Sequence, residues 1–119
     1  MSKRILVVED DPDTRRAVML VLERCGYVVK GTEDGQAGLN ALALSHFDGM
    51  VLDLYMPVLN GFGVLRSLKE NHLSLPVVMI TGHRECAAQA LVEGAKVCLI
   101  KPFEWQVLQQ AAERWFGPA

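Results

Sequence analysis

Short runs of apolar residues alternate with longer amphipathic stretches along the chain. The short runs are continuous and not interrupted by polar residues, which is typical of parallel strands buried on both faces. The stretches between them are long enough for crossover helices. The pattern therefore predicts five strands, at residues 5–8, 28–29, 50–54, 77–80 and 97–100.

The intervening stretches predict five helices. The first follows Asp11 and has Pro12 at its first position, where a missing N–H group is harmless, and it ends at Gly26. The others are expected after a cap at Asp34, from about Gly61, over about 84–93, and before Gly117 and Pro118. The residues that we expect to face inward are Ala17, Leu20, Val21 and Cys25 in the first helix, Leu39, Leu42 and Ala43 in the second, Phe62, Leu65 and Leu68 in the third, and Leu108, Ala111, Ala112 and Trp115 in the last.

Five strand–helix units in 119 residues predict a single domain over residues 1–119. No internal repeat, low-complexity tract or Pro/Ser-rich linker divides the chain. Units of this kind build an α/β fold, an open, doubly wound parallel sheet with helices on both faces. Ligands of such sheets bind beyond the carboxyl ends of the strands, so the residues at those ends are the candidates for function.

Polar residues stand at the carboxyl ends of four predicted strands. Glu9 and Asp10 follow the first strand, and Asp53 lies at the end of the third. Thr81 follows the fourth strand and Lys101 follows the fifth. All six aspartates of the chain lie at or before Asp53, so the acidic charge is not spread at random. We therefore expect one pocket that gathers carboxylates, a hydroxyl group and an ammonium group.

Crowded carboxylates repel one another, and Lys101 neutralises only one of them. A further cation is therefore expected, and a small set of hard oxygen ligands favours Mg²⁺, which keeps several waters and also binds phosphate oxygens. A pocket with Mg²⁺, a free carboxylate, a hydroxyl group and an ammonium group suits phosphoryl transfer. Asp53 is then the candidate nucleophile, and the product is an aspartyl phosphate.

The same residues carry a resemblance to a known family. Over nearly its whole length, the sequence resembles the receiver domain of bacterial two-component response regulators. The matching segments, in order, are ILVVEDD at 5–11, DLYMP at 53–57 with Gly61 after it, ITG at 80–82 and KPF at 101–103. Each segment alone is weakly specific, but all four in order at strand ends are specific. The resemblance implies a flavodoxin-like five-stranded parallel sheet.

The resemblance also implies a phosphorylation-operated switch in a two-component phosphorelay. Asp53 would take the phosphoryl group from a sensor histidine kinase or a histidine phosphotransfer protein, in a Mg²⁺-dependent reaction. Thr81 would hydrogen-bond the phosphoryl group, and Lys101 would pair with it from a cis peptide bond to Pro102. Such a domain catalyses only its own phosphorylation and dephosphorylation, so we do not expect an enzyme in the ordinary sense.

For the metal, the resemblance implies a set of oxygen ligands around Asp53. Asp10 would bind Mg²⁺ directly and Glu9 would bind it through water. The backbone carbonyl of Tyr55 would be a further ligand. Asp11 is not normally a ligand in the family, so it is interpreted as the cap of the first helix.

One position departs from the family pattern. Receiver domains usually have Tyr or Phe three residues before the lysine, and this ring swings inward when the threonine moves. Here the position is Cys98. How the signal is read out is therefore open, although the fourth helix, fifth strand and fifth helix form the expected output face. The response is expected from a C-terminal output domain or from a separate target protein.

Charge and cysteine content narrow the class of protein. Twelve Lys and Arg residues against 14 Asp and Glu residues give a net charge of −2 without a basic stripe, so direct nucleic-acid binding is not expected. The three cysteines, Cys25, Cys86 and Cys98, lack C-x-x-C spacing, which favours a reducing, cytoplasmic location. No signal-peptide core and no apolar run of the ~18 residues that span a membrane is found, so neither secretion nor membrane insertion is expected.

Each candidate residue also has an ordinary structural interpretation. Glu9 and Asp10 stand before a helix, whose amino end any acid stabilises by about 0.3–1 kcal/mol. Asp53 is then a surface carboxylate, Lys101 its ion-pair partner and Thr81 a β-branched strand residue. Against this interpretation, one cap is enough for a helix, whereas four acids stand within five positions.

The three histidines give no sign of a zinc site. His46, His72 and His83 share no ligand spacing. His83 stands two residues after Thr81, beside the mouth of the expected pocket. It is therefore either a plain loop residue or one that steers water toward a phosphoryl group.

Three other functions stay open at this point. A magnesium-dependent phosphatase with an aspartyl nucleophile has a second acid two residues on, where this chain has Tyr55. A nucleotide-binding flavodoxin-like module needs a phosphate loop after the first strand, where this chain has acids. The third is a receiver-like interaction module that is not phosphorylated, which Cys98 favours and the complete set of pocket residues disfavours.

Overall fold

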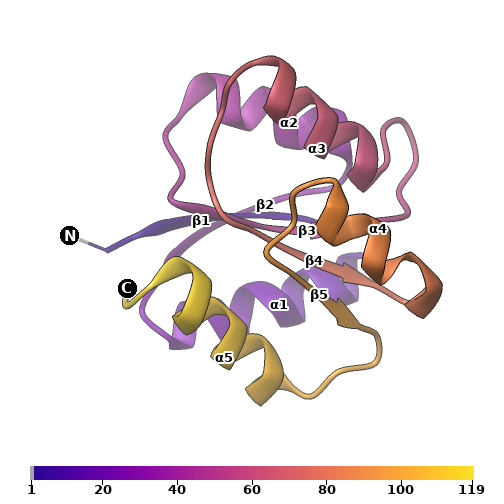
Figure 1. The fold of residues 1–119 in the computed structure, drawn as a ribbon. Coiled ribbons are helices and arrows are strands. Elements are labelled where there is room, and N and C mark those ends of the chain that lie inside the picture. Colours follow the sequence, from indigo (N-terminus) through magenta and orange to yellow (C-terminus); the bar gives the residue numbers. More distant parts are fainter. Residues whose placement is uncertain (1) are drawn as a thin grey trace.

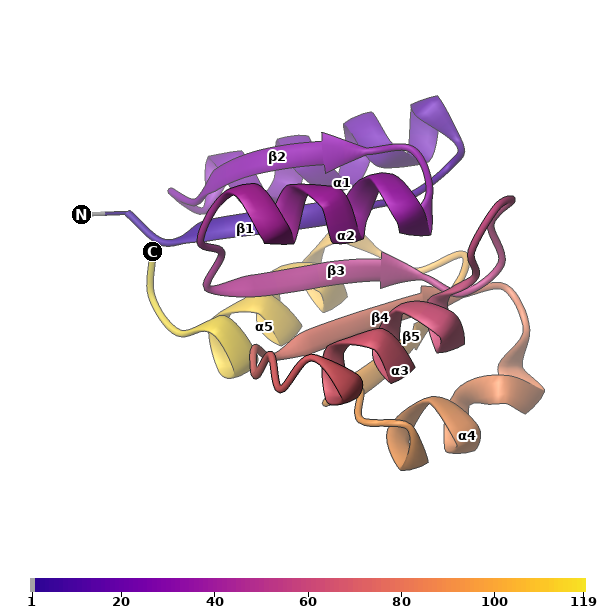
Figure 2. The ribbon, with the colours of Figure 1, turned by 90° about the horizontal axis from the view of Figure 1, so that it is seen from above.

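The computed structural model describes residues 2–119 and contains one five-stranded parallel sheet. Its strands lie side by side and run in one direction (Figure 2). They are β1 (Arg4–Val8), β2 (Val28–Thr32), β3 (Gly49–Asp53), β4 (Val77–Thr81) and β5 (Val97–Ile100), in the order β2-β1-β3-β4-β5. The predicted doubly wound parallel sheet is confirmed, and its strands differ from the predicted ranges mainly by a residue at one end or the other, with β2 longer.

Helices cover both faces of the sheet (Figure 1). The α-helices are α1 (Pro12–Arg24), α2 (Gly35–Leu44), α3 (Gly61–Glu70), α4 (Ala87–Val92) and α5 (Trp105–Phe116), and a 3-10 turn, η1 (Arg84–Cys86), precedes α4. Helices α2, α3 and α4 pack on one face, whereas α1 and α5 pack on the other. The arrangement agrees with the prediction from the alternation of strands and helices.

The continuous apolar runs are explained by two separate cores. Leu6 and Val8 of β1 contribute to the core beneath α2 and α3, while Ile5 and Val7 contribute to the core beneath α1 and α5. Successive side chains of a strand point to opposite faces, so a strand covered on both sides is apolar at every position. All four of these side chains are fully buried.

The helix caps follow the predictions. The carboxylate of Asp11 accepts a hydrogen bond from the N–H of Thr14 at 2.9 Å, and that of Asp34 accepts one from the N–H of Ala37 at 2.8 Å. Both acids therefore satisfy a backbone donor that the first turn of a helix leaves free. Each helix therefore starts shortly after the preceding strand ends.

The predicted inward face of α1 is partly wrong. Val18 and Leu22 are the buried residues of this helix, whereas Leu20 and Ala17 are exposed. The reason is that the sheet contacts the Val18 side of the helix. The neighbouring side, with Ala17 and Val21, lines a groove of about 600 Å³ against α5.

Three further details differ from the predictions. The fourth helix is divided into η1 and α4, and in the described part of the chain neither begins with a side-chain cap. Ala43 of α2 is exposed, because Ala41 occupies the inward position. Trp115 is half-buried against the core of the α1 and α5 side and not enclosed in it.

The strand order places the reversal point of the sheet at the carboxyl ends of the neighbouring strands β1 and β3. The chain changes direction across the sheet there. Helix α1 connects β1 to β2 on one side of β1, and α2 connects β2 to β3 on the other side of β1. Loops at such a reversal point diverge and leave a crevice at the carboxyl ends of the strands. Glu9 and Asp10 directly follow β1, and Asp53 is the last residue of β3, so the crevice is lined by acids.

Gly61, at the start of α3, is expected to be required for the position of Asp53. A Cβ atom on Gly61 would lie 2.8 Å from the carbonyl oxygen of Asp53 and 3.0 Å from the Cα atom of Leu54. Because both contacts are backbone atoms, they cannot rotate away. We expect Gly61→Ala to lower the free energy of unfolding by about 1–3 kcal/mol, measured by urea denaturation.

Gly82 provides the matched control for this substitution. No described atom lies within 4 Å of a Cβ placed on Gly82, so Gly82→Ala should change the free energy of unfolding much less. Equal losses in the two variants would show that close packing against the end of β3 is not what Gly61 provides.

Candidate functional site

The three buried polar or charged residues among residues 2–119 all lie at the carboxyl edge of the sheet. They are Glu9, Asp53 and Thr81, whose exposed fractions are 0%, 5% and 1%. They follow or end β1, β3 and β4, three adjacent strands. Burying carboxylates costs free energy unless they are paired, so this cluster needs a compensating charge.

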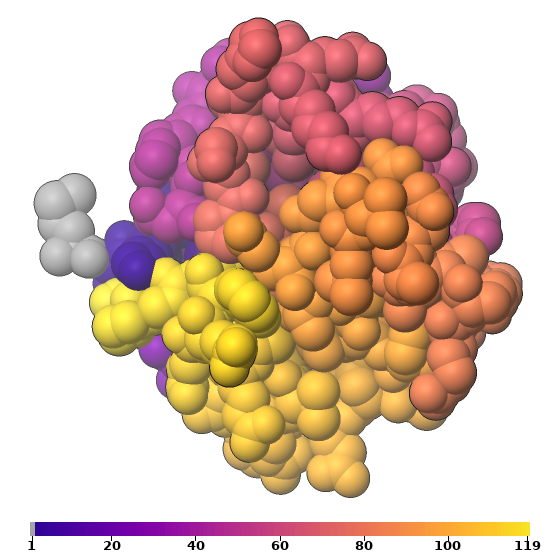
Figure 3. Space-filling model, viewed as in Figure 1, coloured from indigo at the N-terminus to yellow at the C-terminus, as the bar shows by residue number. Residues whose placement is uncertain are grey.

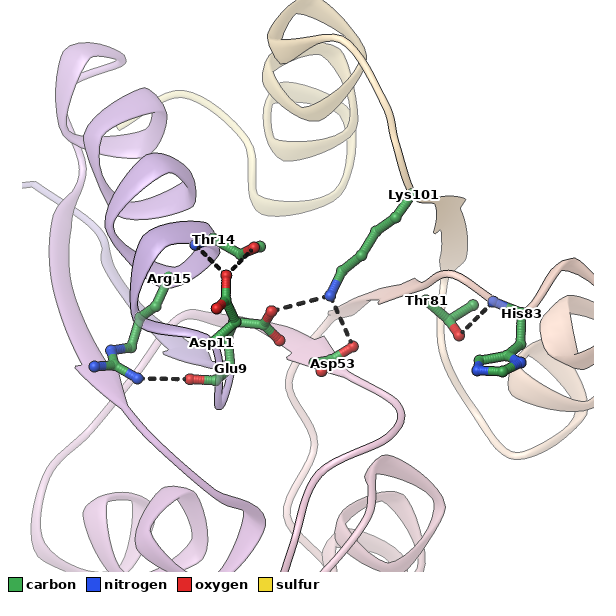
Figure 4. A network of polar contacts seen from close by, with 8 residues as sticks. All are labelled: Glu9, Asp11, Thr14, Arg15, Asp53, Thr81, His83 and Lys101. Carbon is green, nitrogen blue, oxygen red and sulfur yellow. Dashed lines mark hydrogen bonds and ion pairs between the residues drawn. The ribbon is translucent and has the colours of Figure 1, made fainter.

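Lys101 supplies that charge from the end of β5. Its ammonium group donates a hydrogen bond to Glu9 Oε1 at 2.9 Å and another to Asp53 Oδ1 at 3.2 Å (Figure 4). The backbone N–H of Lys101 donates to the carbonyl oxygen of Thr81 at 2.8 Å, which fixes the start of the loop after β5. The peptide bond between Lys101 and Pro102 is cis, as the resemblance implied.

The charges in the pocket do not balance. Glu9 and Asp53 share one ammonium group, and Asp10 adds a third, exposed carboxylate beside them. Oxygen atoms from these three acids lie within 4.8 Å of one another. Among residues 2–119, Glu9 Oε2 is buried without a hydrogen-bond partner. An unpartnered buried carboxylate oxygen within a set of hard oxygen donors fits a divalent cation such as Mg²⁺.

The pKa of Glu9 is raised from 4.5 to about 8, chiefly by burial and also by the neighbouring Asp53, while Lys101 acts in the opposite direction. For Lys101, burial alone lowers the pKa of the ammonium group. The hydrogen bond to Glu9 and the negative charge of Asp53 outweigh this effect, so the pKa of Lys101 is raised overall. The metal-free pocket therefore favours a proton on Glu9, and a bound cation would displace it.

The acids around the pocket have separate structural roles. Asp11 caps α1, and its hydrogen bonds from Thr14 lower its pKa. Glu9 points into the pocket and not toward the helix end, while its backbone carbonyl accepts a hydrogen bond from the guanidinium group of Arg15 at 2.9 Å. Helix capping therefore accounts for Asp11 but not for Glu9.

Thr81 has a partner that the sequence did not suggest. Its hydroxyl oxygen accepts a hydrogen bond from the N–H of His83 at 3.0 Å. The rings of His83 and Tyr55 meet edge to face with 4.4 Å between centroids, and the Tyr55 hydroxyl is hydrogen-bonded to Cys86 Sγ at 3.4 Å. The contact between Tyr55 and Cys86 has no signal in the sequence, because it joins positions 31 residues apart.

The structure brings most of the residues that the sequence predicted for the site to one edge of the sheet. Glu9, Asp10, Asp53 and Lys101 converge in one pocket, and Thr81 lies at the next strand end. Cys98 is half-buried on β5, opposite Met79. In the described part of the chain, no histidine belongs to the acidic cluster.

Comparisons with known proteins agree with this geometry. A family profile described as "Response regulator receiver domain" matches residues 5–113. The chain is 35% identical to the "Transcriptional regulatory protein QseB" of Haemophilus influenzae over 102 residues, which are 84% of this chain and 46% of that protein. It is 34% identical to the "Sensor histidine kinase RcsC" of Escherichia coli over 108 residues, 89% of this chain and 11% of that protein. The solved receiver domain of NtrX from Brucella abortus superposes with a TM-score of 0.89 at 34% identity, covering 97% of this chain and 99% of that one.

The chain therefore belongs to the response regulator receiver domain family, a class of signalling switches in two-component systems. Its pocket of Glu9, Asp10 and Asp53 fits phosphorylation of an aspartate with Mg²⁺. The chain spans about half the length of QseB and about a tenth of RcsC. Within residues 2–119, every helix falls short of the length and apolarity that a membrane crossing requires.

The raised pKa of Glu9 predicts how the stability of the metal-free protein depends on pH. Between its ordinary pKa of 4.5 and its folded pKa of about 8, the folded state binds more protons than the unfolded state. The free energy of unfolding therefore falls as the pH rises through this window. We expect a loss of about 1 kcal/mol or more, measured by urea unfolding with a chelator at the two ends of the window.

Glu9→Gln is the control, because glutamine has a similar shape and does not titrate. Its stability should vary much less than that of the wild type over the same window. Added Mg²⁺ should also remove most of the decline in the wild type, since the cation binds the ionised carboxylate. Equal slopes in the wild type and Glu9→Gln would contradict the raised pKa of Glu9.

Proposed function

We propose that Asp53 is the phosphoacceptor of a receiver domain formed by residues 1–119, and that phosphorylation changes the domain's output face. The observation that carries the proposal is the position of the Lys101 ammonium group between the buried carboxylates of Glu9 and Asp53. The arrangement brings charged groups from three strand ends to one crevice, where an incoming phosphoryl group finds a nucleophile and cations together.

A carboxylate oxygen of Asp53 attacks phosphorus while the bond from phosphorus to the donor nitrogen breaks. The nitrogen leaves with the bonding electrons and takes up a proton, and Asp53 becomes an acyl phosphate. Asp10, Asp53 and the carbonyl of Tyr55, with Glu9 through water, would hold Mg²⁺, which would supply charge stabilisation to the phosphoryl oxygens.

Lys101 and Thr81 stabilise the transferred group. The ammonium group of Lys101 already lies 3.2 Å from Asp53 Oδ1, so it needs little movement to pair with a phosphoryl oxygen bound to that carboxylate. The Thr81 hydroxyl retains a free hydrogen to donate, because its contact with His83 uses only an acceptor site. Lys101 is therefore positioned before the reaction, which lowers the reorganisation that phosphorylation requires.

The proposed donor is the phosphohistidine of a sensor histidine kinase or a histidine phosphotransfer protein. The similarity to parts of RcsC and QseB supports a two-component setting, in which a C-terminal output domain or a separate target protein responds. The three unpaired cysteines support a cytoplasmic location. The domain would act on no substrate beyond its own Asp53.

The other functions that the sequence left open fit the pocket less well. A phosphatase of this type needs a second carboxyl group two residues after the nucleophile, and Tyr55 offers a phenol that contacts Cys86 instead. A nucleotide phosphate would meet the carboxylates of Glu9 and Asp10 after β1. An interaction module that is not phosphorylated does not require the charged groups of Glu9, Asp53 and Lys101 to come together in a buried pocket.

Labelling of Asp53 is the direct test. We expect incubation with acetyl phosphate and Mg²⁺ to add one phosphoryl group, seen by intact mass, and Asp53→Asn to abolish the adduct because an amide is a poor nucleophile. Asp13→Asn, an exposed acid in the first turn of α1, should keep it. A phosphorylated histidine kinase should give the same adduct faster. Labelling that survives in Asp53→Asn would refute the assignment.

A further inference from the structure

Four residues at the rim of the pocket form a closed set of contacts that the transfer chemistry does not use. We call Tyr55, Thr81, His83 and Cys86 the rim cluster. The Thr81 hydroxyl accepts a hydrogen bond from the N–H of His83. The ring of His83 packs edge to face against that of Tyr55, and the Tyr55 hydroxyl is hydrogen-bonded to Cys86 Sγ. The N–H of Cys86 donates to the carbonyl oxygen of His83 at 3.0 Å, which closes the set.

The Thr81 hydroxyl is able to hold two partners at once. A hydroxyl group has one hydrogen to donate and two acceptor sites. It therefore keeps the N–H of His83 while giving its hydrogen to a phosphoryl oxygen on Asp53. When the hydroxyl is drawn toward that oxygen, the backbone of His83 follows, because the 3.0 Å hydrogen bond joins them.

Tyr55 fixes the other side of the cluster. It stands two residues after Asp53 in the loop that follows β3, and its side chain is half-exposed. Its ring contacts His83 and its hydroxyl contacts Cys86, so a shift of His83 changes both contacts. Cys86 is the last residue of η1 and leads directly into α4.

The segment that the cluster reaches is weakly held. In the described part of the chain, neither η1 nor α4 has a side-chain cap, and Ala90 is the buried residue of α4. Leu91 and Val92 are 50% and 73% exposed. The orange atoms of α4 lie uncovered on the near face of the molecule (Figure 3). Few buried contacts imply a low free energy of local rearrangement, so small forces from the pocket suffice to move this segment.

We propose that the rim cluster is a relay that couples the Thr81 hydroxyl to η1 and α4, with Tyr55 and Cys86 as its positioning residues. The proposal rests on the proposed function, since it needs a phosphoryl group on Asp53. Cys98 has no ring to swing into the pocket, and it stands half-buried on β5. The relay runs through the segments after β3 and β4, because the contacts of the rim cluster join these two segments.

Amide hydrogen exchange of residues 84–92 tests the relay, with the phosphoryl mimic beryllium trifluoride and Mg²⁺ as the probe. In the wild type, the mimic should change exchange in this segment. Tyr55→Phe keeps the ring and loses the hydroxyl, and Cys86→Ala loses the thiol. Each single variant should lose about half or more of the change in hydrogen exchange that the mimic causes in the wild type. The double variant should lose no more than either single variant, because the two substitutions remove the same contact between Tyr55 and Cys86.

The control variants separate this proposal from the phosphorylation site. Cys25→Ala removes a thiol at the end of α1, on the other face of the sheet, and should keep the full change. Cys25→Ala and Cys86→Ala should form the Asp53 adduct with acetyl phosphate to the wild-type extent. The relay is overturned if Tyr55→Phe and Cys86→Ala both show the same change in hydrogen exchange of residues 84–92 as the wild type. It is also overturned if the wild type forms the adduct and the mimic leaves exchange in this segment unchanged. Absence of the adduct in the wild type overturns the proposed function itself.

Discussion

The pocket depends on one ion-pair arrangement, in which a single ammonium group serves two buried carboxylates. Lys101 joins Glu9 and Asp53 across 92 and 48 residues of sequence. Removing such groups from water costs several kcal/mol for each ion, so the pairing is stable only where the fold delivers all three to one place. A parallel sheet does this, because the carboxyl ends of its strands share one edge. One ammonium group for two carboxylates favours a proton on Glu9 in the metal-free pocket, and a bound cation would displace that proton.

Adjacent acids diverge in role because the chain changes direction between them. Glu9 continues the inward alternation of β1 and is fully buried, whereas Asp10 is exposed at the mouth and Asp11 turns to cap α1. Three consecutive carboxylates are therefore a buried group with a raised pKa, a candidate metal ligand and a helix cap. The end of a parallel strand is well suited to such a division, since the backbone must leave the sheet and start a helix within a few residues.

The sequence predicted most of the fold, because each strand is apolar at every position and each crossover has helical spacing. It also placed Glu9, Asp10, Asp53 and Lys101 at one edge, since that follows from parallel topology alone. It could not show the direction in which a helix presents its faces, so the inward side of α1 was misplaced by one position. It also missed the contact of Tyr55 with Cys86, which depends on how two loops of different strands meet and has no local pattern.

Mg²⁺ binding by variants of two adjacent aspartates tests whether the three carboxylates of the pocket share one cation. Asp10 belongs to the acidic cluster of the pocket, whereas Asp11 caps α1. In titration calorimetry, Asp10→Asn should therefore weaken Mg²⁺ binding about tenfold or more. Asp11→Asn should leave it nearly unchanged, since an asparagine side chain still caps the helix. Equal effects of the two substitutions, or tight binding kept by Asp10→Asn, would contradict the convergence of three carboxylates on one cation.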